Sequence, residues 1–181
     1  NSPAVTQKVK DIQAYGTCKI MSRDKIARQA RFGLAVENWI QANSINISAL
    51  QCWESIEKNY GCAACVTMSM MGEKLMPSAC EVDVAGVISM YALTLAAQTP
   101  SALLDWNNNF AEDRNKVVCT HCSNYPKSFF QNEIEIGSLD VLGTVLGSED
   151  TFGAVKGKVA AGKMTYFRIS TDDTSGQIKS Y

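Results

Sequence analysis

The sequence predicts an α/β fold in which part of an open parallel sheet is followed by an incomplete antiparallel β-barrel. Two observations carry this prediction. Residues 78–105 are patterned as a strand, a helix and a second strand, and such a crossover unit implies that the two strands are parallel. After residue 110, short extended segments alternate with turn residues and no long helical pattern appears. So few strands cannot close a barrel, and we therefore expect an incomplete one.

Local patterns predict the elements of the first half. Residues 1–21 show no clear periodicity and are interpreted as a lead-in. A helix is predicted over residues 24–42, where apolar residues recur at helical spacing after Ser22, a residue type that caps helices. The other elements predicted before residue 77 are a strand at 47–51, a short helix at 53–60 ended by Gly61, and a strand at 64–70.

The second half opens with the most clearly marked helix of the sequence. Asp83 can cap a helix over residues 84–97, which are apolar on nearly all sides and are therefore predicted to be buried. Strands are predicted on either side of it, at 78–82 and 101–105. The later predicted strands lie at 116–120, 133–136, 154–160 and 163–170, with Ala161-Gly162 as a hairpin turn between the last two and an unpatterned polar end at 171–181.

These patterns divide the chain into two predicted domains. Residues 1–106 are expected to form the end of an α/β domain that carries the candidate carboxylates. Residues 107–181 are expected to form the start of the antiparallel barrel, which we predict to be truncated.

Composition excludes several classes of protein. Hydrophobic residues make up 46% and charged residues 19%, which is typical of a globular protein and excludes disorder. The net charge of −1 leaves no basic surplus for a nucleic-acid partner. No apolar run reaches the roughly 18 residues that a membrane helix needs, and no signal peptide is visible. The chain begins with Asn1 rather than Met, so we expect its true start to be missing.

The cysteines indicate a cytoplasmic protein with reduced thiols. There are seven of them, an odd number, and several have apolar neighbours, which favours buried thiols over a disulfide framework. Cys62 and Cys65, with Cys119 and Cys122, suggest a zinc site as an alternative. The interval between the pairs far exceeds the roughly 15–20 residues of compact zinc ribbons, so we predict no zinc. His121, the only histidine, is predicted to be a polar loop residue.

Two acidic residues are the candidate site. Glu81 and Asp105 each lie at the carboxyl end of a predicted parallel strand, and such ends share the sheet edge where ligands bind in α/β proteins. Two acids at this edge could bind a hard divalent cation or divide general acid and base roles. The alternative is structural: Glu81 would join Asp83 at the helix N-terminus and Asp105 would cap a turn.

The residues that follow Asp105 suit a sugar ligand. Trp106 offers an apolar face to C–H groups, and the amide of Asn107 both donates and accepts hydrogen bonds. We therefore assign Trp106 and Asn107 to substrate binding. The competing interpretation is an asparagine-rich turn between domains.

Several motifs resemble the L-fucose isomerase family. They are PSACEVDVAGVISMYAL at 77–93, PSALLDWNN at 100–108, HCSNYPKSF at 121–129 and the segment 164–171. The resemblance covers most of the chain from about residue 22. Its most specific feature is an acid before an apolar helix and a second acid before Trp-Asn, 24 positions later.

This resemblance implies an enzyme that interconverts aldoses and ketoses, such as L-fucose and L-fuculose or D-arabinose and D-ribulose. It implies a divalent metal, typically Mn²⁺, held by a Glu, an Asp and a His. Glu81 and Asp105 match the two acids, and in the family they also carry protons between C1 and C2 through an ene-diol. The family fold is two α/β domains followed by a β-barrel domain, in subunits that form homo-oligomers.

The third ligand of the family does not match this chain. It is a histidine further along the barrel, and His121 does not occupy that motif. We therefore expect an internal fragment that is inactive alone and acts with the rest of its parent chain. The alternatives are a non-catalytic sugar-binding or regulatory domain on the same scaffold, and a zinc-stabilised interaction module.

Overall fold

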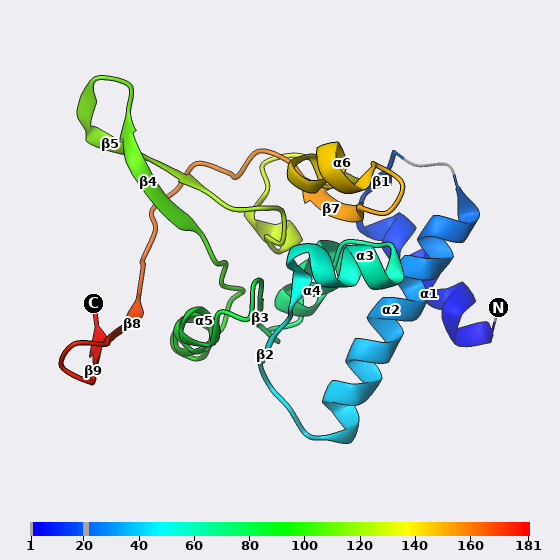
Figure 1. Cartoon of the computed structure of the whole chain (residues 1–181), viewed down its shortest axis with the longest axis horizontal. Helices are drawn as coiled ribbons and strands as arrows, with labels where there is room; N and C mark the ends of the chain where they lie inside the picture. Colours follow the sequence, from blue (N-terminus) through cyan, green and yellow to red (C-terminus); the bar gives the residue numbers. More distant parts are fainter. Residues whose placement is uncertain (1, 20–21) are drawn as a thin grey trace.

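The computed structural model describes residues 2–19 and 22–181 and shows a mixed α/β protein (Figure 1). The helices are α1 (Pro3–Tyr15), α2 (Arg23–Ala42), η1 (Cys52–Ile56), α3 (Glu57–Tyr60), α4 (Cys65–Glu73), α5 (Val84–Ala97), η2 (Lys127–Phe129) and α6 (Asp140–Leu146). The strands are β1 (Thr17–Cys18), β2 (Ser48–Ala49), β3 (Ser78–Ala79), β4 (Asp105–Phe110), β5 (Asp113–Thr120), β6 (Glu135–Ser138), β7 (Phe152–Lys156), β8 (Ile169–Asp172) and β9 (Gln177–Ser180). No described helix combines the length and apolar character that crossing a membrane requires.

The main core surrounds a small mixed sheet of order β1-β6-β7. Strand β1 pairs with β6 in parallel, and β6 pairs with β7 antiparallel. Helices α1, α2 and α4 supply apolar side chains that pack with this sheet, and Phe152 of β7 is fully buried among them. Helix α6 and the start of α4 form a second cluster with Ala154 of β7.

The predicted lead-in at residues 1–21 is wrong, because most of it is helix α1. The Ser2 side chain accepts a hydrogen bond from the Val5 N–H at 3.4 Å, and Pro3 occupies the first turn, where its missing N–H costs nothing. Val5 and Ile12 are buried in the core. These apolar positions are too widely interspersed with polar residues to give a clear sequence signal. Residues 1, 20 and 21 lie outside the described part of the chain.

Helix α2 confirms the helix predicted over 24–42, although Ser22 makes no side-chain capping bond. Strand β2 confirms the strand at 47–51, and Gly61 ends α3 in the left-handed conformation with φ 75°. The strand predicted at 64–70 is wrong, because this segment forms helix α4, buried along almost its whole length. A short continuous apolar run does not distinguish a buried strand from a buried helix.

Helix α5 begins and ends as predicted, and the Asp83 side chain accepts a bond from the Gly86 N–H at 2.7 Å. Its burial was predicted wrongly, since Val84, Ile88 and Leu95 are exposed. The strand–helix–strand unit is also wrong: β3 pairs in parallel with β2, and residues 101–104 form no strand. Here Ser101 donates a hydrogen bond to the Met90 carbonyl, which ties the chain to α5 instead of to a sheet.

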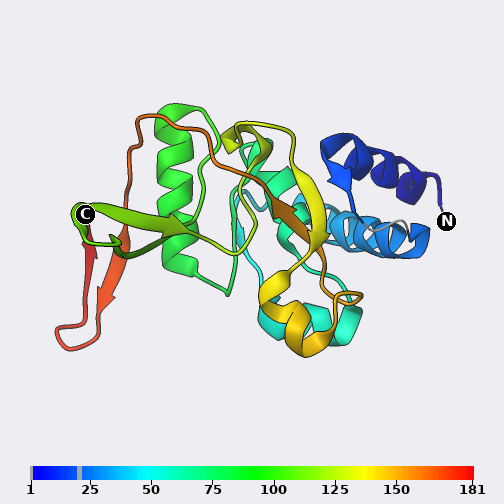
Figure 2. The ribbon, with the colours of Figure 1, turned by 90° about the horizontal axis from the view of Figure 1, so that it is seen from above.

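The second half contains antiparallel hairpins, and no closed barrel forms within the described residues. Strands β4 and β5 form one isolated pair, and β8 and β9 form another. The strands predicted at 116–120, 133–136 and 154–160 correspond to β5, β6 and β7. The hairpin predicted at Ala161-Gly162 is wrong, since this stretch is an extended connection and the end predicted to be unpatterned folds into β8–β9. Figure 2 shows α5 apart from α1 and α2, with the C-terminal hairpin beyond it.

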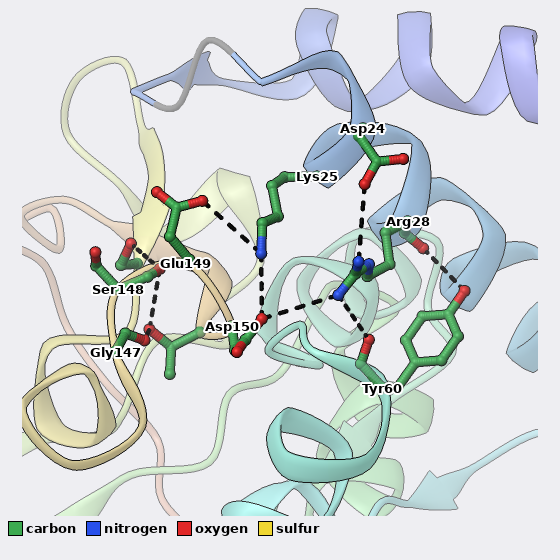
Figure 3. Close-up of polar contacts among 10 residues, drawn as sticks. Asp24, Lys25, Arg28, Tyr60, Gly147, Ser148, Glu149 and Asp150 are labelled. Atoms are coloured by element: carbon green, nitrogen blue, oxygen red, sulfur yellow. Dashed lines mark hydrogen bonds and ion pairs between the residues drawn. The ribbon is translucent and has the colours of Figure 1, made fainter.

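Ion pairs join the start of α2 to the loop after α6 (Figure 3). Lys25 Nζ lies 3.1 Å from Asp150 and 3.8 Å from Glu149. Arg28 also contacts Asp150, at 3.8 Å, and donates to the Tyr60 carbonyl at 3.3 Å. Partly exposed pairs of this kind contribute little individually, but this network orients three separate segments.

We predict that α1 is an essential part of the core. Replacing Ile12, which is 1% exposed, by Ala should lower the free energy of unfolding by about 2–5 kcal/mol, because it removes buried apolar atoms and leaves a cavity. The matched control is Ile178→Ala, because Ile178 is 76% exposed. This substitution should change the free energy of unfolding by less than about 0.5 kcal/mol. Urea unfolding of the chain measures both. Equal losses of stability in the two variants would contradict the packing of α1 in the core.

Candidate functional site

Glu81 lies in the tight turn between β3 and α5. It is exposed, and it and Val82 both adopt the left-handed conformation, with φ values of 59° and 57°. Such a conformation costs about 1–2 kcal/mol for an ordinary residue and is unusual for a β-branched one. Hydrogen bonds hold the turn: the Glu81 N–H donates to Cys52 Sγ at 3.4 Å and the Val82 N–H donates to the Leu50 carbonyl at 3.2 Å. The segment at Leu50 and Cys52 therefore fixes where Glu81 stands.

Asp105 enters the site from the β4–β5 hairpin. It is the first residue of β4, is exposed, and pairs with Thr120, the last residue of β5. His121 follows Thr120 directly, so the hairpin register fixes Asp105 beside the segment that carries this histidine. The two acids thus reach the site from a turn and a hairpin, not from the ends of two parallel strands.

His121 is where the two acidic segments meet. Burial lowers the pKa of His121, but a hydrogen bond to Cys122 and the charges of Cys122, Asp105 and Glu81 outweigh it, so the pKa is raised. Both candidate carboxylates therefore act electrostatically on one imidazole. His121 lies in a loop, as predicted, but the sequence did not indicate this environment, because it arises from segments that are distant in the sequence.

Trp106 forms an exposed aromatic corner next to Asp105. Its indole is 55% exposed and packs edge-to-face with Tyr166, at 5.3 Å between ring centroids. Tyr166 belongs to the extended connection before β8 and was not predicted as a site residue. Asn107 donates to Thr120 Oγ1 at 3.0 Å across the hairpin, so its amide also supports the local structure.

Four thiols lie in contact with one another near the candidate site, in a combination that the sequence did not predict. Cys80 Sγ lies 3.8 Å from Cys122 Sγ, and the thiols of Cys52 and Cys65 hydrogen-bond to this pair. All seven cysteines are free. Of the two pairs suggested by sequence spacing, Cys65 contacts Cys122, whereas Cys119 is exposed on β5. Cys62 is buried, which raises its pKa to about 12.

The four thiols differ strongly in acidity. Hydrogen bonds with Cys65 and Cys80, together with the neighbouring imidazole of His121, lower the pKa of Cys122. The contact with Cys122 raises the pKa of Cys80 and of Cys65. Cys122 is therefore the thiol that carries negative charge most readily, as a metal ligand or a nucleophile must.

The site thus offers two kinds of donor. Glu81 and Asp105 present carboxylate oxygens at the surface, which suit hard cations such as Mn²⁺ or Mg²⁺. Cys80, His121 and Cys122 present ligand atoms that all lie within 4.8 Å of one another beneath that surface. Sequence reasoning identified the first set and assigned the second to inert or loop residues.

We predict that Val82 is strained by its backbone conformation. Val82→Asn should raise the free energy of unfolding by about 1 kcal/mol, since asparagine tolerates the left-handed region far better than valine. The control, Val84→Asn, changes the same residue type at similar exposure within α5 and should not stabilise the chain. Thermal unfolding tests both, and a loss of stability in Val82→Asn would refute the assigned strain.

We predict that the imidazole titration reports the two carboxylates directly. In the reduced, metal-free chain His121 should titrate above its ordinary pKa of about 6.5, and Glu81→Gln or Asp105→Asn should each lower that pKa. Because the folded-state pKa is raised, protonation stabilises the fold fully below about pH 6.5, and this stability is lost as pH rises through the folded pKa. NMR of the single histidine measures it. The controls Glu112→Gln and Asp173→Asn should leave the pKa of His121 unchanged. An unchanged pKa in Glu81→Gln and Asp105→Asn as well would show that these two acids do not act on His121.

Comparison with known proteins shows similarity to sugar isomerases. The family described as L-fucose isomerase, C-terminal domain, matches residues 119–181. A sulfoquinovose isomerase of Alkalicoccus urumqiensis is 32% identical over 97 residues, which are 54% of this chain and 22% of the relative. A sulfoquinovose isomerase of Priestia megaterium is 30% identical over 99 residues, which are 55% and 22% of the two chains.

The matched region spans about a fifth of the length of these curated relatives. No solved structure matches the chain. The family match and the relatives agree with the motifs that surround Glu81, Asp105 and His121, since all of them indicate sugar isomerases. The resemblance of this chain to the L-fucose isomerase family is confirmed, with residues 119–181 related to its C-terminal domain.

Proposed function

We propose that this chain carries the paired-carboxylate part of an aldose–ketose isomerase site. The observation that carries the proposal is that both acids stand beside the segment of His121: Asp105 pairs with Thr120, and Cys80, which precedes Glu81, lies 3.8 Å from Cys122 between their Sγ atoms. The charges of both acids contribute to the raised pKa of His121. The relatives support the reaction class, because their names describe isomerases of a sugar, sulfoquinovose. We propose an aldose of the L-fucose or D-arabinose type as the substrate; the description of the matching family, L-fucose isomerase, supports the first of these.

The donor set fits the divalent cation that this family uses. Two exposed carboxylates supply anionic oxygens, the preferred ligands of Mn²⁺, and we assign metal binding to both. When bound, such a cation is a Lewis acid that polarises the sugar oxygens and stabilises the negative charge that develops on them. The third ligand belongs, in this proposal, to the rest of the parent chain.

The carboxylates themselves move the protons. One carboxylate takes the proton from C2 of the aldose and delivers it to C1, and the other transfers the hydroxyl proton of O2 to the carbonyl oxygen O1. These transfers pass through an ene-diol and yield the ketose with no net gain or loss of atoms. Because Glu81 and Asp105 are exposed, both carboxylates are accessible to a sugar that approaches from solvent.

The aromatic corner orients the sugar. The exposed Trp106, held by its edge contact with Tyr166, presents an apolar face that can pack on sugar C–H groups. Asn107 adds an amide at the same edge of the hairpin. Together they would hold the ring so that C1 and C2 face the carboxylates.

The assignment predicts a severe loss of turnover when either charge is removed. In the full-length parent enzyme, Glu81→Gln and Asp105→Asn should each lower kcat by roughly 100-fold or more and weaken Mn²⁺ binding. Ketose formation and manganese affinity are the measurements. Glu112→Gln and Asp173→Asn, which make the same chemical changes at exposed turn positions, should be near normal. Near-normal turnover in both site variants would show that these acids are structural.

The aromatic corner predicts a different kinetic signature. Trp106→Phe keeps an aromatic face but loses the indole donor, so KM should rise while manganese affinity stays the same. Trp39→Phe is the matched control, because Trp39 is 56% exposed and Trp106 is 55% exposed. Unchanged KM in Trp106→Phe would remove Trp106 from the substrate site.

A further inference from the structure

We propose that Cys80, His121 and Cys122 form a site for a zinc-like divalent cation, distinct from the carboxylate site. Cys52 supplies the fourth ligand. The ligand atoms of the first three residues already lie within 4.8 Å of one another. This inference departs from the sequence-based prediction of no zinc, which considered only Cys62, Cys65, Cys119 and Cys122. It goes beyond the isomerase proposal and does not depend on it.

The sulfur geometry matches a tetrahedral metal site. Zinc–sulfur bonds are about 2.3 Å long, so two thiolates at tetrahedral positions lie about 3.8 Å apart. Cys80 Sγ and Cys122 Sγ are 3.8 Å apart. A disulfide needs about 2.05 Å, so these sulfurs stand at the spacing of ligands and not of a covalent pair.

Cys52 is better suited than Cys65 as the fourth ligand. Cys52 Sγ hydrogen-bonds to Cys80 and accepts the Glu81 N–H at 3.4 Å, a contact that suits an anionic thiolate. Cys65 Sγ instead donates to the Cys122 carbonyl oxygen at 4.0 Å, a contact that needs the protonated thiol. A metal ligand must be a thiolate, which favours Cys52.

Buried polar groups around the cluster lack hydrogen-bond partners, and a bound cation would compensate for this lack. Glu57 is 1% exposed, and neither of its carboxylate oxygens has a hydrogen-bond partner among the described residues. Glu57 directly follows η1, which contains Cys52, and the adjacent Ile56 packs against the cluster that holds Cys52 and Cys80. His121 Nδ1 is likewise buried without a partner in this part of the chain. Burying an uncompensated charge is costly, and a bound divalent cation would offset that cost.

The donor chemistry separates this site from the carboxylates. Thiolate and imidazole ligands select zinc, whereas carboxylate oxygens suit Mn²⁺ and Mg²⁺. Zinc here would join three segments: the one after β2, the turn after β3 and the end of β5. Because Cys80 adjoins Glu81 and His121 adjoins Thr120, the partner of Asp105, such a link would fix the two acids relative to each other.

The first test uses the unaltered chain. The reduced 181-residue protein, loaded with zinc and freed of excess metal, should retain about one zinc per chain by elemental analysis. Cobalt(II) in its place should give sulfur-to-cobalt charge-transfer absorption with the intensity of about three thiolates. This measurement does not rely on any variant folding correctly.

The second test uses matched variants. Cys80→Ser and Cys122→Ser should each weaken zinc binding by more than the roughly 10–100-fold that loss of an outer-shell partner costs. Cys119→Ser changes an exposed cysteine of β5 and should bind zinc normally. Glu81→Gln and Asp105→Asn should also keep their zinc, which distinguishes this site from the isomerase proposal.

Three results would overturn the proposal. The reduced chain could show no cobalt–thiolate absorption, the serine variants at Cys80 and Cys122 could retain zinc, or a Cys80–Cys122 disulfide could form in a protein whose reduced form takes up no zinc. Retained zinc in Cys119→Ser, together with loss in both other serine variants, supports it.

Discussion

The contact between Cys80 and Cys122 is the constraint on which the candidate site depends. These sulfurs, 3.8 Å apart, join the turn before α5 to the end of the β4–β5 hairpin. Glu81 directly follows one of them, and Asp105 pairs with Thr120, two residues before the other. This contact therefore links the segment of Glu81 to the segment that pairs with Asp105.

Charge and burial divide the site into an inner and an outer part. The inner part contains thiols, the His121 imidazole and the buried Glu57, and it is poor in hydrogen-bond donors to that carboxylate. The outer part holds the exposed Glu81 and Asp105. The raised pKa of the His121 imidazole has contributions from Cys122 of the inner part and from the charges of Asp105 and Glu81 of the outer part. This arrangement suits a chain in which the inner groups fix geometry and the outer ones perform chemistry.

Elements with strong local signals were predictable from the sequence. Asp83 and the apolar run behind it identify α5 with its exact bounds, and helical periodicity identifies α2. Elements decided by tertiary contacts were not. Ser101 is tied to the Met90 carbonyl of α5, so the apolar segment after Pro100 forms no strand. An apolar run alone gave no means of recognising α4 as a helix.

For the same reason, the candidate site could be predicted only in part from the sequence. Glu81 and Asp105 were recognised because their neighbours resemble a known family, while Tyr166 and the thiol cluster come from segments that no local pattern connects. The strand–helix–strand unit that suggested the two acids belong together does not form. The hairpin register instead places Asp105 opposite Thr120, and the Cys80–Cys122 contact links the turn of Glu81 to the same segment. The domain boundary expected at residue 106 stays a prediction.

The central claim is that Glu81 and Asp105 bind a hard cation beside His121. Paramagnetic Mn²⁺, added to the reduced chain, tests it by its effect on the NMR signal of the only histidine. We expect Mn²⁺ to broaden the His121 resonance selectively, and the Glu81→Gln and Asp105→Asn double variant to abolish the broadening. Broadening that persists unchanged in the double variant, or none in the original chain, would contradict this account.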